Sequence, residues 1–572
     1  MTPRATTALA RKTTLVMLGV FLLGACSKAN SARKAVSRRF HHAPVWTPAA
    51  PAAVKGVPQA EMQAALTTRL DAAPPAGVKA DSWRHTRALY KSLGVTPLWL
   101  TASGLDKDRA RVLTDAVIRI NDDALRTDEY PISELSAALT AVQHAPNPTA
   151  AQWADVDVLL STVYAALGSD MLVGQIAPKS VGQSWHINPL EDDVDSALVH
   201  SLGDTLERGL AEMRPPDADY AALQKELTHY RDIAMKPDWP VVPKGKTLRT
   251  GQSDSPSRMT ALRSRLFAEG LIADSTGGAV YDSVLAGAIG QFQAHHAITV
   301  DKTLSPETVN SLNVSAAYRL GQIAANLERM RWMPRNLGDR YIYVNVPAFH
   351  LTAYDSGEKA LDMKVIVGQD YEDKATPVFS DSMETVVFRP YWLITPSIQS
   401  SEIGPRIAAD PAYMDRENLE YYKDGGVQRI RQKPGPKNAL GFVKFLFPND
   451  YNIYLHDTPN HELFNKDVRA FSHGCIRVEK PTELAQWVLG WDAARVQQAM
   501  ADGSPDNTSI KLPRKLPVYI TYGTAYVRDG QLYFGNDLYH RDDKLVKAAA
   551  EAALPGAAAR EKLEELKKIA AN

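Results

Sequence analysis

The chain has very little cysteine and no surplus of charge. Only Cys26 and Cys475 occur among 572 residues, so each cysteine needs its own explanation. Lysine plus arginine and aspartate plus glutamate number 65 each. Without a basic excess or a recognisable motif, nothing points to a nucleic-acid partner. The length fits roughly three to five domains, and 45% hydrophobic residues are enough for more than one core.

No apolar run at the N-terminus is long enough to cross a bilayer, which takes about 20 residues. Instead, a basic start precedes an apolar stretch of about eleven residues, and the first part of the chain, 1–25, is typical of an export signal. The stretch ends in Leu23-Gly24-Ala25-Cys26. This tetrad resembles the lipobox of bacterial lipoproteins, in which cleavage leaves the cysteine as a lipid-modified N-terminus. The alternative is a signal anchor with a chance cysteine.

The lipoprotein resemblance implies a location and leaves Cys475 without a disulfide partner. A lipid on Cys26 would anchor the protein to a membrane, and Ser27, in place of an aspartate, resembles outer-membrane sorting in Gram-negative bacteria. We therefore expect a periplasmic, lipid-anchored protein. In that oxidising compartment a lone thiol is a liability unless it is used, which favours a functional role for Cys475 over a buried, inert one.

Composition and hydrophobic periodicity divide the rest of the chain into segments. An Ala- and Pro-rich basic stretch cannot build a core and is expected to be disordered. Apolar residues at three- and four-residue spacing predict helices as far as Arg331, and alternating β-branched and aromatic residues predict strands from Tyr341 onward. The fold class is therefore multidomain α+β. The predicted segments are a tether (26–60), an all-α scaffold domain (61–236), a Pro- and Gly-rich linker (237–256), a three-helix unit (257–315), a connector helix (316–338), a strand-rich domain (339–525) and a C-terminal extension (526–572).

The strand pattern lapses between about 396 and 440, inside the strand-rich domain. Residues 397–409 and 416–422 have helical patterns, and a polar run with Asp424-Gly425-Gly426 follows. A loop this long is usually functional or disordered, so we interpret it as a helical and loop-forming cap over the active site. Further on, the Ala-, Lys- and Glu-rich tail, 545–570, is predicted as one helix.

Ser472-His473-Gly474-Cys475-Ile476-Arg477 places a thiol in the setting that acyl transfer needs. His473 stands two positions before the cysteine, and a second histidine, His456, lies upstream at the end of a predicted strand. Acyl transfer requires a thiolate, a base to make it, and N–H donors for the oxyanion. Gly474 lets the main chain approach a substrate carbonyl closely. The reactive groups are thus expected on loops at strand ends.

These residues resemble the catalytic domain of the L,D-transpeptidases, bacterial enzymes that cross-link peptidoglycan. The family signature is a His-x-Thr segment followed by Ser-His-Gly-Cys-x-Arg, and the chain has both, His456-Asp457-Thr458 and residues 472–477. The stretch 435–481 is similar to large members of the family that carry a helical scaffold, a wall-binding-like domain and an inserted capping segment. The three-helix unit, with Leu262-Arg263-Ser264-Arg265-Leu266 and Phe292-Gln293, resembles the peptidoglycan-binding domain.

The resemblance implies a role for each residue of the signature. Cys475 would attack the carbonyl of the third residue of a donor tetrapeptide stem and expel the terminal D-alanine. His456 would be the proton donor and acceptor. His473 is the alternative base, or a support for the turn. The N–H groups of Gly474 and Cys475 would hold the oxyanion.

Substrate recognition is expected from the neighbouring side chains. Arg477 would either clamp a substrate carboxylate by two hydrogen bonds or brace the turn, and Tyr454 and Ser472 would shape the site. The side-chain amine of the third residue in an acceptor stem would resolve the thioester. Neither a metal nor an organic cofactor is needed for these steps.

Three alternatives use the same residues differently. Water in place of the amine would make the protein an L,D-carboxypeptidase or endopeptidase. If Cys475 is unreactive, the protein would be a non-catalytic wall-anchoring lipoprotein, anchored in a membrane by a lipid on Cys26 and bound to glycan through 257–313. Zinc bound by His456, His473 and Cys475 would need better ligand spacing than His-Gly-Cys in one turn provides.

Overall fold

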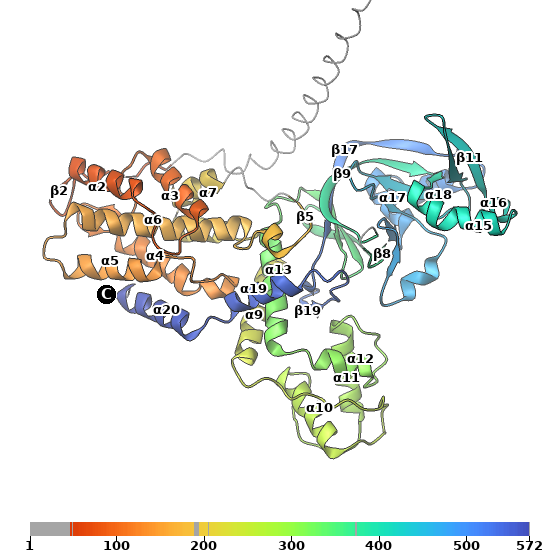
Figure 1. The fold of residues 1–572 in the computed structure, drawn as a ribbon, viewed down its shortest axis with the longest axis horizontal. Helices are drawn as coiled ribbons and strands as arrows, with labels where there is room; N and C mark the ends of the chain where they lie inside the picture. Colours follow the sequence, from red (N-terminus) through yellow and green to blue (C-terminus); the bar gives the residue numbers. More distant parts are fainter. Residues whose placement is uncertain (1–45, 49, 188–193, 204, 372–373, 571–572) are drawn as a thin grey trace, which may run out of the picture.

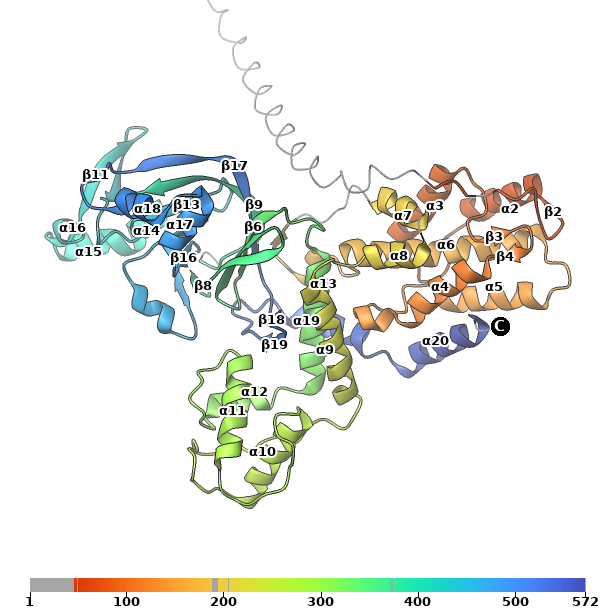
Figure 2. The same cartoon turned by 180° about the vertical axis from the view of Figure 1, so that it is seen from behind.

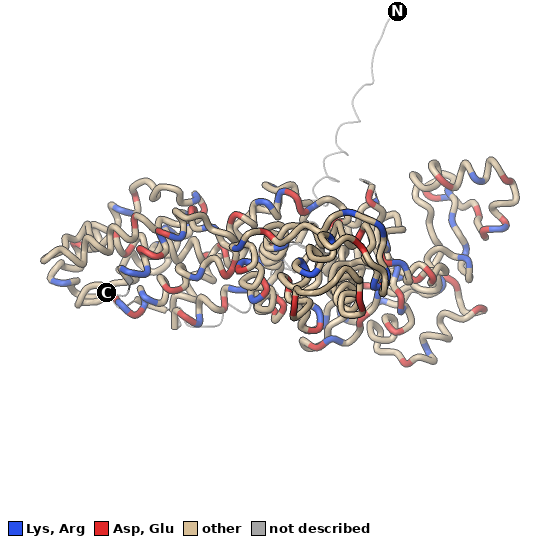
Figure 3. The backbone as a smooth tube through the Cα atoms, turned by 90° about the horizontal axis from the view of Figure 1, so that it is seen from below, with Lys and Arg blue, Asp and Glu red and all other residues tan. Residues whose placement is uncertain are grey.

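The computed structural model describes residues 46–48, 50–187, 194–203, 205–371 and 374–570. The predicted export signal and the lipidation residue Cys26 lie outside these residues. The chain forms a long helical lobe, a strand-rich lobe at the opposite end and a small helical lobe beneath their junction (Figure 1 and, from behind, Figure 2). Basic and acidic residues are interspersed over all three lobes (Figure 3), as the balanced charge count implies.

The helical lobe is built around one helix that is buried along nearly its whole length. This helix, α6 (Ala150–Val173), starts at a capping box formed by Thr149 and Gln152. It is long and apolar enough to cross a membrane, but 89% of that stretch is buried inside the lobe, as expected for a helix that is apolar all round. The elements around it are α2 (Gln59–Asp71), α3 (Ala80–Leu93), β3 (Leu100–Thr101), β4 (Gly104–Leu105), α4 (Lys107–Ile118), α5 (Ile132–His144), α7 (Val194–Gly203) and α8 (Leu206–Glu212).

The predicted tether is ordered at its end. Residues 53–58 form a hairpin of β1 (Ala53–Val54) and β2 (Val57–Pro58), and Val54 is buried in the core of the helical lobe. The guanidinium of Arg109 lies 4.8 Å from the ring centroid of Trp46, a cation–π contact. These contacts fix the segment, so the boundary that we predicted at residue 60 is too late.

Helices from distant parts of the chain pack together where the lobes meet. They are α9 (Ala218–Ala234), α13 (Ala316–Arg331) and α19 (Asp543–Ala553), and the hairpin of β18 (Ala525–Arg528) and β19 (Gln531–Phe534) packs against them. The fully buried guanidinium of Arg331 donates to Tyr220 Oη at 2.8 Å and pairs with Glu328. The predicted connector helix is therefore α13, a buried helix against which α9 and α19 pack. We had predicted α9 as part of the scaffold domain.

The C-terminal tail returns to the helical lobe. We predicted one helix over 545–570, but the structure has two, α19 and α20 (Ala557–Ala570). Leu554-Pro555-Gly556 separates them, because proline and glycine interrupt a helix. Helix α20 packs against α4 and α5, with Leu563 and Leu566 buried in their core, and runs alongside the helical lobe (Figure 1).

The small lobe contains the predicted three-helix unit, α10 (Pro256–Ala268), α11 (Ser283–His295) and α12 (Pro306–Leu312). Each helix begins at a serine or aspartate cap. Apolar residues of all three helices, such as Leu262, Ile289 and Leu312, are buried in one core. Val242 and Leu248 belong to that core, and Leu248 exchanges backbone hydrogen bonds with Leu304. The linker that we predicted over 237–256 is therefore shorter.

The strand-rich lobe is confirmed and is a closed barrel. Its strands are β6 (Arg340–Asn345), β7 (His350–Asp355), β8 (Glu358–Gly368), β9 (Val378–Phe388), β13 (Val443–Leu446), β14 (Leu455–His456), β15 (Ala470–Ser472), β16 (Ile476–Val478) and β17 (Thr508–Thr521). Their order is β13-β14-β16-β8-β7-β6-β17-β9, and β13 also pairs with β9, so the sheet closes. Outside it lie β5 (Trp185–His186), paired with β9, and the helices α17 (Pro481–Leu489) and α18 (Ala493–Met500).

The cap is a small folded unit with more strand than we predicted. It contains β10 (Trp392–Leu393), α14 (Pro396–Ile398), a π-helical turn (Gln399–Ile403), α15 (Gly404–Ala409), α16 (Tyr413–Arg416), β11 (Leu419–Asp424) and β12 (Val427–Gln432). The helical prediction for 416–422 is wrong, because β11 pairs with β12 there. Gly425 and Gly426 both have positive φ, of 57° and 87°, and a two-residue loop of that kind favours a hairpin.

Candidate active site

Two short neighbouring strands carry the candidate catalytic residues. Strands β14 and β16 run parallel, with Leu455 opposite Ile476 and His456 opposite Arg477. Leu455 and Ile476 are fully buried in the barrel core. Since successive residues of a strand face opposite sides, His456 and Arg477 point to the other face, which Cys475 shares.

The thiol of Cys475 is half-buried and protonated at neutral pH. Its Sγ donates a hydrogen bond to the Asn452 carbonyl oxygen at 3.5 Å. Burial raises the pKa of the thiol to about 11, although hydrogen bonds from Tyr454 and the charges of Arg477 and Lys444 favour the thiolate. We expected a histidine to increase the thiolate fraction, and the direction of the shift is the opposite. Within the described residues, Sγ makes no hydrogen bond to an imidazole.

The ring of His456 is buried and neutral. Nδ1 lies 2.6 Å from the Asp457 carbonyl oxygen. A carbonyl oxygen only accepts, so Nδ1 carries the proton and Nε2 keeps a free lone pair. Burial, and then the positive charges of Arg477 and Lys444, lower the pKa of the imidazole to about 3. The ring is therefore unprotonated at neutral pH, as a general base must be.

Ser472 and Gly474 hold the turn that presents the thiol. Ser472 Oγ donates to the Cys475 carbonyl oxygen at 2.5 Å and accepts from the Gly474 N–H at 3.2 Å. Gly474 has φ of +113°, in the left-handed region that favours glycine, and its carbonyl accepts from Thr376 Oγ1 at 2.9 Å. We predicted the Gly474 N–H as an oxyanion donor, but here it is donated to Ser472. The Cys475 N–H remains as the backbone donor for that role.

His473 contacts the cap. Its Nε2 lies 2.6 Å from Oε1 of Glu402, in the π-helical turn of the cap. Lys374 Nζ is 3.4 Å from the same oxygen. The hydrogen bond from His473 lowers the pKa of the Glu402 carboxyl. The geometry thus favours a structural role for His473, between cap and catalytic turn, over its role as the alternative base.

Two cations flank His456 on one face of the sheet. Arg477 is its partner on β16, and Lys444 is its partner on β13. Burial lowers the pKa of both side chains. The Nε of Arg477 is buried without a hydrogen-bond partner among the described residues. Of the two roles considered for Arg477, the geometry therefore favours recognition of an anion over bracing of the turn.

Sequence reasoning missed three residues of this site. Glu402 and Lys444 are described above, and the third is Tyr539, from the predicted C-terminal extension. Its hydroxyl donates to the Gly368 carbonyl oxygen at 2.7 Å and accepts from the Thr376 N–H at 3.2 Å, so it supports the catalytic turn. Lys444 could have been found as the one charged residue in the strand pattern 441–445, whereas Glu402 and Tyr539 had no local signal.

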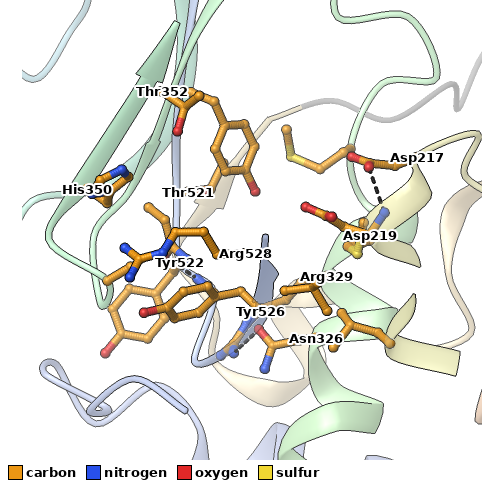
Figure 4. A pocket seen from close by; sticks show the side chains of 18 of the residues that line it. Asp217, Asp219, Asn326, Arg329, His350, Thr352, Thr521, Tyr522, Tyr526 and Arg528 are labelled. Carbon is orange, nitrogen blue, oxygen red and sulfur yellow. Dashed lines mark hydrogen bonds between the residues drawn. The ribbon is translucent and has the colours of Figure 1, made fainter. Parts of the chain in front are cut away.

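A cavity of about 300 Å³ lies elsewhere, between α9, α13 and the strands β6, β7 and β17 (Figure 4). Its wall includes Asp217, Asp219, Tyr341 and Tyr354. Burial, and then the charge of Asp217, raise the pKa of Asp219 to about 6. Residues of the catalytic signature do not line this cavity. In the described ranges, no three His, Cys, Asp or Glu side chains are placed to hold a metal ion.

Each of the two large lobes matches the model of a known protein family. Residues 339–520 match the family model of the L,D-transpeptidase catalytic domain, a range that includes the signature and the cap. The barrel is an L,D-transpeptidase catalytic domain. Residues 84–227, within the helical lobe, match the family model of a Scaffold domain. A catalytic domain of this family indicates that the protein is an enzyme.

Individual relatives cover only part of the chain. A "Putative L,D-transpeptidase" of Haemophilus influenzae is 33% identical over 244 residues, which are 39% of this chain and 48% of the relative. The chain therefore spans about half the length of that curated relative. Solved L,D-transpeptidases from Xylanimonas cellulosilytica and Stackebrandtia nassauensis are 14% and 12% identical. The matches cover 49% and 51% of this chain and 99% of each solved chain. Their TM-scores are 0.17 and 0.20, too low to support a structural argument.

Proposed function

We propose that the protein cross-links peptidoglycan as an L,D-transpeptidase, through a thioester on Cys475. The observation that carries this proposal is the shared face of β14 and β16. There, a half-buried thiol, a neutral imidazole and an unpaired guanidinium lie together in a catalytic domain of this family. The substrates are a donor tetrapeptide stem and an acceptor stem whose third residue has a side-chain amine.

The first half-reaction forms the thioester. His456 Nε2 takes the thiol proton while Sγ of Cys475 bonds to the carbonyl carbon of the donor's third residue, and the Cys475 N–H donates to the oxyanion. The bond to the terminal D-alanine nitrogen then breaks. The imidazolium returns its proton to that leaving amine.

The second half-reaction transfers the stem. The acceptor amine attacks the thioester carbon and gives a proton to His456, and the carbon–sulfur bond breaks. The thiolate that leaves takes up that proton, which restores the starting state. Hydrogen bonds from Tyr454 favour the thiolate and stabilise it as it forms and leaves.

The resting charge state decides when the thiol becomes reactive. With a thiol pKa of about 11 and an imidazole pKa of about 3, thiol and imidazole are both neutral at pH 7. Proton transfer to His456 therefore accompanies the attack on the substrate. A resting thiolate is absent, so a thiol in an oxidising compartment is protected between turnovers.

The regions outside the barrel are proposed to bring the enzyme to its substrate. A lipid on Cys26 would anchor it in the periplasm, at the outer membrane of a Gram-negative bacterium. The small lobe would bind peptidoglycan, in line with its sequence resemblance. Ser472 and Gly474 would hold the turn and Arg477 would bind a substrate carboxylate, and no metal or organic cofactor enters the steps above.

Incubation with tetrapeptide muropeptides, followed by mass spectrometry, tests the proposal. Dimers joined through third residues, with release of D-alanine, are the expected products. Tripeptide monomers alone would mean hydrolysis of the same thioester, an L,D-carboxypeptidase. Cys475→Ala should abolish both products. Products that persist in that variant would contradict the nucleophile, and intact tetrapeptide with the unchanged chain would favour the wall-anchoring alternative.

A further inference from the structure

Three side chains from three strands form one row on the catalytic face. Lys444 on β13 is the direct partner of His456 on β14, and His456 is the direct partner of Arg477 on β16. Partners in neighbouring strands point to the same side of the sheet. The imidazole therefore lies between an ammonium and a guanidinium.

The positive charge in this row has no paired acid among the residues that the structure describes. Neither Lys444 nor Arg477 forms an ion pair or a side-chain hydrogen bond with a described residue, and Glu462, the acid that acts on Arg477, acts without pairing. In the same domain, Arg389 is paired with Asp502 at 2.8 Å and with Asp506 at 2.9 Å. Partly burying a cation without a partner is costly, so two such cations on either side of His456 point to an anionic ligand.

We propose that Lys444 and Arg477 together hold the terminal carboxylate of the donor stem across His456. The inference rests on the proposed function and adds Lys444 as a residue that determines substrate specificity. Strands β13 and β16 are two strand spacings apart, about 10 Å, which two long side chains can bridge through one carboxylate. Both cations also act on the charge of Cys475, so the row lies close to the sulfur.

The position of the row fits a carboxylate one residue beyond the scissile bond. Arg477, which belongs to the row, follows Cys475 by two residues. At about 3.3 Å per residue, the row therefore lies about 7 Å from Cys475 along the strands. The leaving residue spans about 3.6 Å of that distance, and the Lys444 and Arg477 side chains cover the rest. A donor that ends at the leaving residue is thereby preferred over a longer one.

Binding of the carboxylate also prepares the base. The charged groups that act on the His456 ring are Lys444 and Arg477, and the ring centroid of Tyr454 lies 5.7 Å from that of His456. Asp457 contributes its carbonyl to Nδ1 and accepts backbone N–H groups on its carboxylate. Burial disfavours the imidazolium most, and the charges of Arg477 and Lys444 add to that effect. A carboxylate between the two cations offsets their part of the shift, so the bound donor itself makes His456 a stronger base.

Two alkylating reagents probe the row without any peptidoglycan. Iodoacetate carries a carboxylate and iodoacetamide does not, and both react with Cys475 alone among accessible thiols once Cys26 has been replaced by serine. The iodoacetate-to-iodoacetamide rate ratio should exceed that of a free thiol about threefold or more at low salt and fall as salt rises. Lys444→Met should lower the ratio, Lys444→Arg should restore it, and Lys511→Met, an exposed lysine of β17, should leave it unchanged. A ratio that Lys444→Met does not change overturns the proposal.

Binding to a variant that cannot react separates this inference from the proposed function. In the Cys475→Ala background, a tetrapeptide stem with a free terminal carboxylate should bind at least fivefold more tightly than its terminal carboxamide, by calorimetry. Adding Lys444→Met should erase most of this preference, whereas Lys444→Arg should retain it. Cross-linking by the unchanged chain with equal affinity for both peptides would refute the inference alone. Tighter binding of the carboxylate peptide by the Cys475→Ala variant, without cross-linking by the unchanged chain, would refute the proposed function alone.

Discussion

The imidazole of His473 and the carboxylate of Glu402 lie 2.6 Å apart, although one belongs to the catalytic turn and the other to the cap. This contact joins two segments that otherwise have separate cores. The cap has its own three-stranded sheet and its own cluster of buried residues, Ile394, Ile403, Leu419 and Ile430. The His473–Glu402 contact therefore ties a separately folded unit to the turn that carries Cys475.

Replacing Glu402 by glutamine should loosen the cap. A partly exposed contact of this kind to a carboxylate is worth up to about 1 kcal/mol, so we expect KM for the donor to rise about two- to fivefold. Proteolytic cleavage within 396–440 should become faster. Steady-state kinetics and limited proteolysis measure these effects, and Glu417→Gln, elsewhere in the cap, is the matched control. Unchanged cleavage and KM in Glu402→Gln would show that the contact does not hold the cap.

The reactivity of Cys475 toward iodoacetamide should rise steadily with pH. Burial raises the pKa of the thiol to about 11, so the thiolate fraction grows about tenfold per pH unit from pH 7 toward 10 and levels off only above 11. A thiolate–imidazolium pair would instead give a rate that is flat from pH 5 to 8. Observation of that flat profile would contradict the neutral resting state.

The stability of the catalytic domain should fall in acid because of His456. Burial lowers the pKa of its imidazole from the ordinary value of 6.5 to about 3 in the fold. Below pH 6.5, His456 therefore binds a proton in the unfolded chain but not in the folded one. The free energy of unfolding falls as the pH drops from 6.5 toward 3. Urea unfolding followed from pH 7 to 4 should show a smaller loss in His456→Gln. An equal loss in both proteins would remove His456 as the cause.

Gly474→Ala should damage activity more than stability. An alanine at position 474 would have to keep the backbone φ of +113°, which costs about 1–2 kcal/mol. Its Cβ would lie 3.0 Å from Ile453 Cδ1, so the turn that presents Cys475 would shift. Gly503→Ala is the control, because Gly503 has a φ of +90° with nothing within 4 Å of the new Cβ. We expect similar losses in Tm from both variants but a loss of turnover of at least tenfold only from Gly474→Ala. Equal turnover would argue against a special role for the turn.

The site could be predicted where its residues are consecutive in sequence. Cys475, Gly474 and Arg477 belong to one turn and strand, and a strand pattern ends at His456, so the sequence alone could suggest that these residues lie near one another, as β14 and β16 place them. Lys444, Glu402 and Tyr539 enter from a third strand, the cap and the C-terminal region. Only the closure of the barrel and the fold of the cap bring them close, and these depend on long-range pairing that a single sequence does not reveal.

The charge state of the site illustrates a second limit. A histidine near a cysteine in the signature favoured the prediction of a thiolate. The structure buries His456 between Lys444 and Arg477, and burial also protonates the thiol. Burial and cross-strand register decide these shifts, and neither can be read from the spacing of Cys475 and His456.

In the fold, too, local features could be predicted and contacts between distant segments could not. Helix and strand patterns predicted a helical first part of the chain and strands from Tyr341 onward, because hydrophobic periodicity is local. They did not predict that α9 and α19 pack on α13, or that α20 completes the helical lobe.

Intact-protein mass spectrometry of the full chain with a tetrapeptide donor, in the absence of acceptor, tests the central claim most directly. We predict an adduct equal in mass to the donor minus D-alanine, located on Cys475 by peptide mapping and absent from Cys475→Ala. A folded chain whose Cys475 is alkylated by iodoacetamide but never acquires this adduct would contradict the account.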